Sequence, residues 1–199
     1  IRRNKMARRL SRGRLFSLNS QGQNSGMAVD PGIRDSLITS TVIRDGHLIT
    51  TEITLDLGST VDPISSMGTA ARVLGVSGTL SSSLGQITEA VNGVITEAEC
   101  ICLEVPTGTG VRKDIDFVSS TSIGVGYSGS LSSITALATA GGDWVKGQNV
   151  VTDLDANATN DKYIYLSLGS ATDGLVDRVY TGGKFVLRLY GYAAPADAP

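Results

Sequence analysis

The chain has 199 residues, of which 41% are hydrophobic and 18% charged, and its formal net charge at pH 7 is −2. This composition excludes a wholly disordered protein, since disorder needs low hydrophobicity and high net charge; the length favours one domain over two. No apolar run approaches the roughly 18 residues of a membrane-spanning helix, so no membrane span is expected. The 24 glycines, with abundant Ser and Thr, favour short strands and turns over long helices.

The basic charge is concentrated at the N-terminus. Residues 1–29 carry seven basic side chains and no acidic one, whereas the remainder carries ten basic and nineteen acidic side chains. This asymmetry is typical of a basic arm on an acidic body, the arm binding an acidic protein surface or nucleic acid phosphates; a solvated, frayed terminus is the alternative. Residues 19–26 have the composition of a flexible linker. The residues predicted to bind a partner are Arg8, Arg9, Arg12 and Arg14, with Leu15 and Phe16 as apolar anchors.

Apolar and polar residues alternate with a period of two through much of residues 30–192, which we expect to form the body. Such alternation predicts antiparallel sheets with one packed and one solvated face. We therefore predict a mainly β fold of about eight strands, an antiparallel β-sandwich or jelly-roll-like body, with residues 193–199 as an extended tail. The residues predicted to face the core are Ile53, Leu55, Leu57, Ile101, Leu103, Val105, Ile115, Phe117, Ile164, Leu166, Leu168, Phe185, Leu187 and Leu189.

One short helix is predicted at residues 131–140, because Leu131, Ile134 and Ala138 have helical spacing and Gly141 supplies a stop signal. Residues 82–91 fit either a helical turn or a strand. Turn signals separate the expected strands, Asp45-Gly46 among them. Asn92-Gly93 is the strongest candidate for a tight hairpin, since both residue types tolerate positive φ.

The two cysteines, Cys100 and Cys102, lie two positions apart in an expected strand. Side chains at that spacing are about 6.6–7 Å apart, at the limit of disulfide geometry. A zinc site would need further ligands, and His47 is the only histidine. We therefore predict buried, free thiols that pack as small hydrophobic groups.

Two loops resemble ligand-binding motifs. Residues 124–129 (GVGYSG) match the G-x-G-x-x-G pattern of dinucleotide sites. The expected strand before them alternates Asp114 and Asp116 with apolar residues, unlike a buried parallel strand, so a plain loop is favoured. Residues Asp153 to Asp161 alternate oxygen-bearing side chains as a calcium loop does, but Ala158 and Ile164 replace the required Gly and Glu. A polar connection between strands is favoured there, and an adventitious calcium ion stays open.

The residues predict no catalytic set. His47 is expected at the surface, and no G-x-S-x-G nucleophile motif occurs. The carboxylate pairs Glu97/Glu99 and Asp114/Asp116 are expected on solvated strand faces. We therefore expect no enzymatic activity, no metal site and no cofactor.

Five of the six tyrosines fall within the last 37 residues. Four of them occupy strand positions opposite the aliphatic stripes, beside an arginine, and Tyr and Arg are favoured in protein interfaces. An oligomer interface is therefore predicted; burial of both strand faces within a sandwich is the alternative. The predicted interface residues are Tyr163, Tyr165, Arg188, Tyr190 and Tyr192.

Several runs of sequence resemble virion structural proteins of marine, cyanophage-like tailed phages, in particular proteins similar to capsid decoration (cement) proteins. The runs are MARRLSRGRLFSLNSQGQ from Met6, RDGHLITTEITLDLG, VNGVITEAECICLEVPTG, DIDFVSS, KYIYLSLG and YTGGKFVLRLYGY. The resemblance covers residues 6–192. It implies a non-enzymatic β-sandwich subunit, a homotrimer, bound to the major capsid protein on the outside of the head.

The implied mechanism is an arm that threads over a neighbouring protomer or over the major capsid protein. Segments that become ordered only on assembly suit clamps made of many weak contacts. The alternatives are a tail or adaptor component of the virion, and a coat protein whose arm contacts nucleic acid. Nucleic acid is the less favoured of these partners.

Overall fold

The computed structural model describes residues 38–58, 63–66, 72–78, 81–156, 158–169 and 178–193. The predicted arm and linker at residues 1–29, and residues 194–199 of the predicted tail, lie outside the described residues. Within the described ranges the fold is mainly β, with eleven strands and one four-residue helix. All the strand pairs are antiparallel. The predicted mainly β fold with antiparallel sheets is therefore confirmed.

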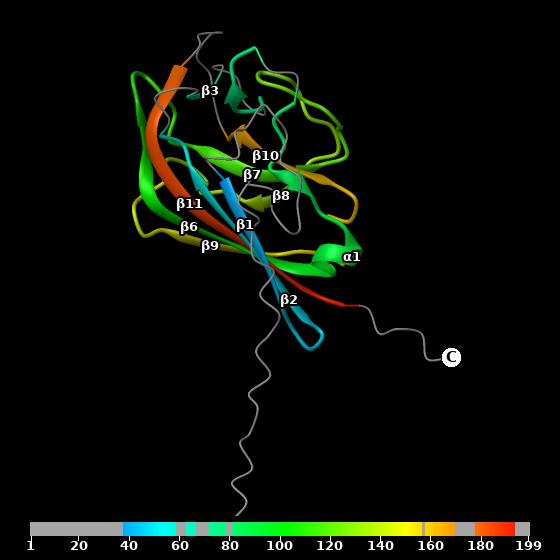
Figure 1. The fold of residues 1–199 in the computed structure, drawn as a ribbon. Helices are drawn as coiled ribbons and strands as arrows, with labels where there is room; N and C mark the ends of the chain where they lie inside the picture. Colours follow the sequence, from blue (N-terminus) through cyan, green and yellow to red (C-terminus); the bar gives the residue numbers. More distant parts are fainter. Residues whose placement is uncertain are drawn as a thin grey trace, which may run out of the picture.

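The large sheet has seven strands, in the order β1-β2-β11-β6-β9, with β3 paired to the first part of β11 and β4 paired to β3. Its centre is formed by β6 and β11, which are fifteen residues each and visibly curved (Figure 1). Register shifts between Tyr180 and Phe185 accompany this curvature, since bulges increase bend and twist. The strands are β1 (Ile38–Asp45), β2 (Leu48–Asp56), β3 (Ile64–Ser66), β4 (Gly75–Val76), β6 (Val94–Gly108), β9 (Asn149–Asp153) and β11 (Arg178–Tyr192).

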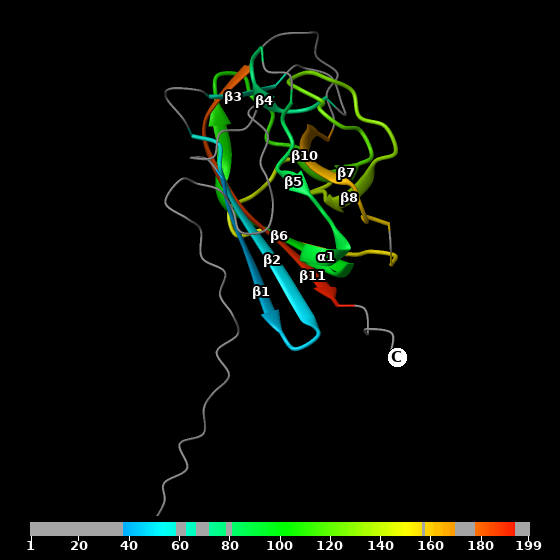
Figure 2. The same cartoon turned by 45° about the vertical axis from the view of Figure 1, so that its right-hand side comes forward.

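The small sheet has four strands in the order β5-β10-β7-β8 and forms the second layer (Figure 2). The strands are β5 (Gly85–Gln86), β7 (Ile115–Ser120), β8 (Thr135–Ala138) and β10 (Tyr163–Leu168). The ring of Phe117 on β7 meets the ring of Phe185 on β11 edge-on, with centroids 5.4 Å apart. Trp144 packs on the same Phe185 ring at 5.3 Å and donates its indole N–H to the carbonyl of Ile115 at 2.6 Å. The two sheets therefore share one core.

The predicted core stripes of β2, β7, β10 and β11 are confirmed. Their predicted residues are all buried: Ile53, Leu55, Leu57, Ile115, Phe117, Ile164, Leu166, Leu168, Phe185, Leu187 and Leu189. In β6 the predicted face is wrong for Ile101 and Leu103, whereas Val105 packs against the core as predicted. Cys100 and Cys102 face the core, whereas Leu103 is 46% exposed. The register places Cys100 opposite Leu187 and Cys102 opposite Phe185. The small thiols therefore pack beside these bulky side chains in the core.

Both cysteines are free, as predicted. Burial raises the pKa of the Cys100 and Cys102 thiols above the ordinary range. They therefore pack as small, uncharged hydrophobic groups.

The predicted helix at residues 131–140 is wrong. Residues Thr135–Ala138 form β8, where Ala138 pairs with Phe117 of β7, and Leu137 enters the core. A short apolar run does not distinguish helix from strand, and pairing with β7 decides the outcome. The helix of the described residues is α1 (Glu89–Asn92), in the segment for which helical turn and strand were both open. No helix in the described ranges has the length and apolar character needed to cross a bilayer.

The predicted hairpin at Asn92-Gly93 is also wrong, because Asn92 is the last residue of α1. The Asn92 side chain accepts from the Thr88 N–H at 2.9 Å and donates to the Thr51 hydroxyl at 2.9 Å. Gly93 has a φ of +70°, and a Cβ there would lie 2.5 Å from the carbonyl oxygen of Tyr192. The pair therefore serves to end a helix against the large sheet rather than to reverse a strand.

The predicted turn at Asp45-Gly46 is confirmed. It joins β1 to β2, with Asp45 paired to Leu48. His47 lies in this turn and is exposed, as expected.

We expect Phe185→Ala to lower the free energy of unfolding by about 3–5 kcal/mol, because it removes the ring that joins Phe117 and Trp144. Val151→Ala, on an exposed part of β9, is the control and should change stability by less than about 0.5 kcal/mol. Urea unfolding followed by the fluorescence of the single tryptophan measures both. A loss below about 1 kcal/mol for Phe185→Ala would contradict a core shared by the two sheets.

Candidate interaction surface

The side of the large sheet that points away from the core is the main candidate surface. Side chains alternate along a strand, so the buried Phe185, Leu187 and Leu189 of β11 leave Arg188 and Tyr190 pointing outward. Strand register brings neighbouring residues into the same surface. This outer face consists of Thr39, Thr41, Ile43 and Asp45 of β1; Leu48, Thr50, Glu52, Thr54 and Asp56 of β2; Lys184, Val186, Arg188, Tyr190 and Tyr192 of β11; Glu97, Glu99, Ile101, Leu103 and Glu104 of β6; and Asn149, Val151 and Asp153 of β9.

A polar network occupies the centre of the outer face. The Arg188 guanidinium donates from Nε to Glu52 Oε2 at 2.8 Å and from Nη1 to Glu99 Oε2 at 3.4 Å. Glu99 also accepts from the Tyr190 hydroxyl at 2.7 Å and from Asn149 Nδ2 at 2.8 Å. The Glu99 side chain is only 16% exposed, so the predicted solvated carboxylate is instead enclosed by partners. The network links β2, β11, β6 and β9.

Hydrogen bonding fixes the charge states in this network. Donation from Tyr190 and Asn149 lowers the pKa of Glu99. The bond to Glu52 raises the pKa of Arg188. Burial, with the bond to Glu99, raises the pKa of Tyr190. At neutral pH the carboxylate and guanidinium are therefore charged and the phenol is neutral.

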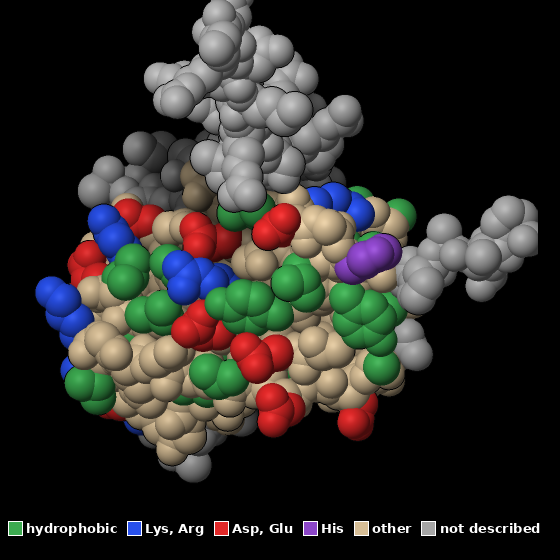
Figure 3. All heavy atoms as spheres, turned by 90° about the horizontal axis from the view of Figure 1, so that it is seen from below, with side chains coloured by type: hydrophobic (Ala, Val, Ile, Leu, Met, Phe, Trp, Pro, Cys, Tyr) green, Lys and Arg blue, Asp and Glu red, His purple; other side chains and the backbone are tan. Residues whose placement is uncertain are grey.

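Exposed apolar side chains surround this network. Leu48 is 67% and Val151 55% exposed, and Ile43, Leu103 and Tyr192 are exposed as well. Figure 3 shows apolar, acidic and basic side chains interspersed over this side of the molecule. The outer face carries seven carboxylates, from Asp45, Glu52, Asp56, Glu97, Glu99, Glu104 and Asp153, and two cations, from Lys184 and Arg188.

The predicted interface residues divide between two places. Arg188, Tyr190 and Tyr192 lie together on the outer face of the large sheet, pointing outward as predicted. Tyr163 and Tyr165 lie on the small sheet. Tyr165 belongs to a cluster separate from the core between the sheets, but its predicted exposure is wrong, because it is fully buried. An interface role for the other four residues stays a prediction.

Tyr165 is buried because a loop lies over the outward side of the small sheet. Its hydroxyl donates to the carbonyl of Ser122 at 2.8 Å, and its ring packs with Val73 and Val118. Val125 and Leu131, from the same loop, pack against this cluster. Sequence alternation cannot reveal such a cover, because the covering residues come from elsewhere in the chain.

The G-x-G-x-x-G segment, residues 124–129, belongs to the loop that covers Tyr165. The prediction that this segment is a plain loop is therefore confirmed. Val73 N–H donates to the Gly129 carbonyl at 3.1 Å, and Ser128 N–H donates to the Val73 carbonyl at 3.0 Å. A Cβ on Gly129 would lie 2.4 Å from Val125 Cγ1. The glycine is therefore explained by close packing within the loop.

Residues 154–162 connect β9 to β10, so the predicted polar connection between two strands is confirmed. Asn157 lies outside the described residues. In the described part of the chain, no group of three or more His, Cys, Asp or Glu side chains is placed to hold a metal ion.

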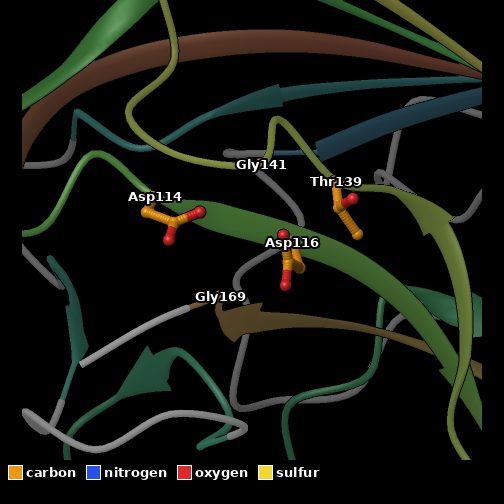
Figure 4. Close-up of a pocket in the computed structure, with 5 residues that line it drawn as sticks. All are labelled: Asp114, Asp116, Thr139, Gly141 and Gly169. Carbon is orange, nitrogen blue, oxygen red and sulfur yellow. The ribbon is translucent and has the colours of Figure 1, made fainter. Parts of the chain in front are cut away.

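A second feature is an acidic pocket at the start of β7, lined by Asp114, Asp116, Thr139, Gly141 and Gly169 (Figure 4). Its volume is about 330 Å³. Asp114 is only 7% exposed, so the predicted solvated position is wrong for this residue. A Cβ on Gly169 would lie 2.4 Å from Asp114 Oδ1. The absence of a side chain at 169 therefore lets the end of β10 pass over the carboxylate.

The acidic pocket holds a carboxylate that takes up protons near pH 6. Burial and the neighbouring charge of Asp114 raise the pKa of Asp116 to about 6. None of the described lining residues is basic. Sequence reasoning missed this pocket, and the Asp-x-Asp pattern at the start of β7 was its only signal.

We expect Tyr190→Phe to lower the free energy of unfolding by about 1 kcal/mol, because Glu99 loses its 2.7 Å hydrogen bond in a mostly enclosed position. Tyr192→Phe, on the same face of β11, is the matched control and should have a smaller effect. Urea unfolding at pH 7 compares the two variants. Equal losses would contradict a specific contribution of the Tyr190 hydroxyl.

We expect Asp116→Asn to be more stable than the unmodified chain at pH 7 by about 1 kcal/mol, a value discounted for the partial exposure of the group. The folded-state pKa of about 6 exceeds the unfolded value near 3.9. The Asp116 contribution is therefore fully present below about pH 4 and is lost as the pH rises through about 6.

Urea unfolding at pH 4 and pH 7 tests this difference, which should vanish at pH 4. Asp143→Asn removes an exposed carboxylate from the β8–β9 connection and serves as the control. A loss of stability at pH 7 in Asp116→Asn would contradict the conclusion that the ionised Asp116 carboxylate destabilises the folded state.

Comparison with known proteins finds no family model, no curated protein and no solved structure that matches this chain.

Proposed function

We propose that this chain is a non-enzymatic structural subunit of a tailed-phage virion, a capsid decoration protein that sits on the outer surface of the head. The observation that carries the proposal is the outer face of the large sheet, where exposed apolar side chains surround an ordered Arg188–Glu52–Glu99 network. The resemblance of residues 6–192 to decoration proteins supports the same function. The proposal also includes a jelly-roll-like body that forms a homotrimer and binds the major capsid protein.

The chemistry of the outer face suits binding to a protein. Tyr and Arg are enriched where interfaces contribute most to affinity, and Tyr190, Tyr192 and Arg188 lie on consecutive outward positions of β11. Tyr190 and Arg188 are held by Glu99 before any partner arrives. Ordering a free side chain on binding costs about 0.5–1.5 kcal/mol, and this cost is reduced for a side chain that is already fixed.

The size of the outer face suits a modest interface. The nine residues of β2 span about 30 Å, and five strands side by side span about 20–24 Å. The resulting area of about 600 Å² approaches the roughly 800 Å² that each partner contributes to a standard interface. Such an interface is adequate when many copies bind one symmetric shell, because repetition multiplies a modest affinity.

The location of the chain on particles tests the proposal. Virions purified from a lysate that contains this chain should be labelled on the head exterior by antibodies against it, as seen by negative-stain electron microscopy. Label on the tail or neck would contradict the decoration role and favour a tail or adaptor component. Label that appears only after particles are disrupted would contradict an external position.

A further inference from the structure

We infer that the outer face of the large sheet binds the basic N-terminal segment, residues 2–16, of a second copy of this chain. The inference rests on the proposed function, because a subunit that assembles must offer its segment to a neighbour rather than cover its own surface with it. The partner bound by the outer face would then be another copy of the same protein.

Charge complementarity supports this occupant. Residues 2–16 carry seven basic side chains and no acidic one, whereas the outer face carries seven carboxylates and two cations. Both cations are already paired: Lys184 with Asp56 at 3.1 Å, and Arg188 with two glutamates. The outer face therefore retains an excess of negative charge that its own side chains do not neutralise. Nucleic acid phosphates and acidic proteins would be repelled from it.

Two of these carboxylates are placed to receive a cation from outside. Glu97 and Asp153 lie directly opposite each other across β6 and β9. Within the described residues neither forms an ion pair, and like charges directly opposite each other destabilise a sheet. A cation bound between them would remove this repulsion.

Apolar contacts add to the match. The N-terminal segment places Leu15 and Phe16 directly after its basic residues. On the outer face, Val151 lies on the same strand as Asp153, and Leu48 is exposed at the β1–β2 end. These exposed side chains offer apolar surface beside the carboxylates, so one segment can make both kinds of contact.

The chain between the N-terminal segment and β1 is long enough for the segment of one copy to reach the outer face of another. The described part begins at Ile38, on edge strand β1 of the same sheet. The 21 residues from 17 to 37 can span at most about 70 Å. This exceeds the length of the outer face, about 30 Å along its strands, so the segment can reach the outer face of an adjacent subunit.

Cross-linking of the full chain tests the inference. Lys5 is the only lysine in residues 1–29, and a carbodiimide joins its amine to a carboxylate only when the two groups are in contact. In an equal mixture of nitrogen-15-labelled and unlabelled chains, cross-links from Lys5 to Glu97 or Asp153 should contain one peptide of each isotope in about half of the products. The inference would be overturned if every such cross-link joined two groups of the same chain. It would also be overturned if no cross-link joined Lys5 to a carboxylate of the outer face.

Binding of a fluorescent peptide of residues 2–18 to the full chain provides a second measurement. Replacing both carboxylates, in Glu97→Gln with Asp153→Asn, should raise the Kd about fivefold. The control, Glu89→Gln with Asp143→Asn, removes two exposed carboxylates outside the outer face and should leave the Kd unchanged. Equal effects of the two variants would overturn the inference. Because no virion is present, failure here is distinguishable from failure of the particle-labelling test.

Discussion

The alternation of side chains along β11 is the constraint on which both the core and the proposed binding surface depend. Residues Phe185, Leu187 and Leu189 fill the space between the sheets, and the residues between them, Arg188 and Tyr190, build the outer face. Since the side-chain period is two, a shift of one residue would exchange these sets. The strands β2 and β6 on either side fix the register of β11, so packing and surface chemistry are set together.

The network around Arg188 contributes more to order than to stability. Exposed ion pairs contribute about 0–1 kcal/mol each, whereas the buried rings around Phe185 contribute several times that amount. The value of the network lies in its connections: Arg188 links carboxylates on both neighbouring strands, and Asn149 extends the network to β9. A surface fixed in this way presents a single arrangement of charge to a partner.

The sequence predicts those parts of the fold that depend on one strand at a time. The inward stripes of β2, β7, β10 and β11 follow from alternation alone. In β6 both faces carry apolar residues, so alternation alone does not show that Cys100 faces the core and Leu103 the solvent. The helix expected at residues 131–140 becomes strand β8 through pairing with β7, and Tyr165 is covered by a distant loop. Each of these outcomes needs contacts between segments far apart in the chain.

The same reasoning explains the mixed outcome for the predicted surface residues. Outward positions on β11 could be recognised from the sequence, but the carboxylate of Glu99 becomes part of a network only because β6, β9 and β11 lie side by side. Asp114 is enclosed because the chain passes over it at Gly169.

Cys100 and Cys102 illustrate how this arrangement affects the chemistry of the chain. Thiolate is the reactive form of cysteine, and burial on the core side of β6 disfavours it for both residues. An alkylating or oxidising reagent can attack these sulfur atoms only after the two layers have separated. Their modification would therefore report on transient opening of the protein rather than on the environment at its surface.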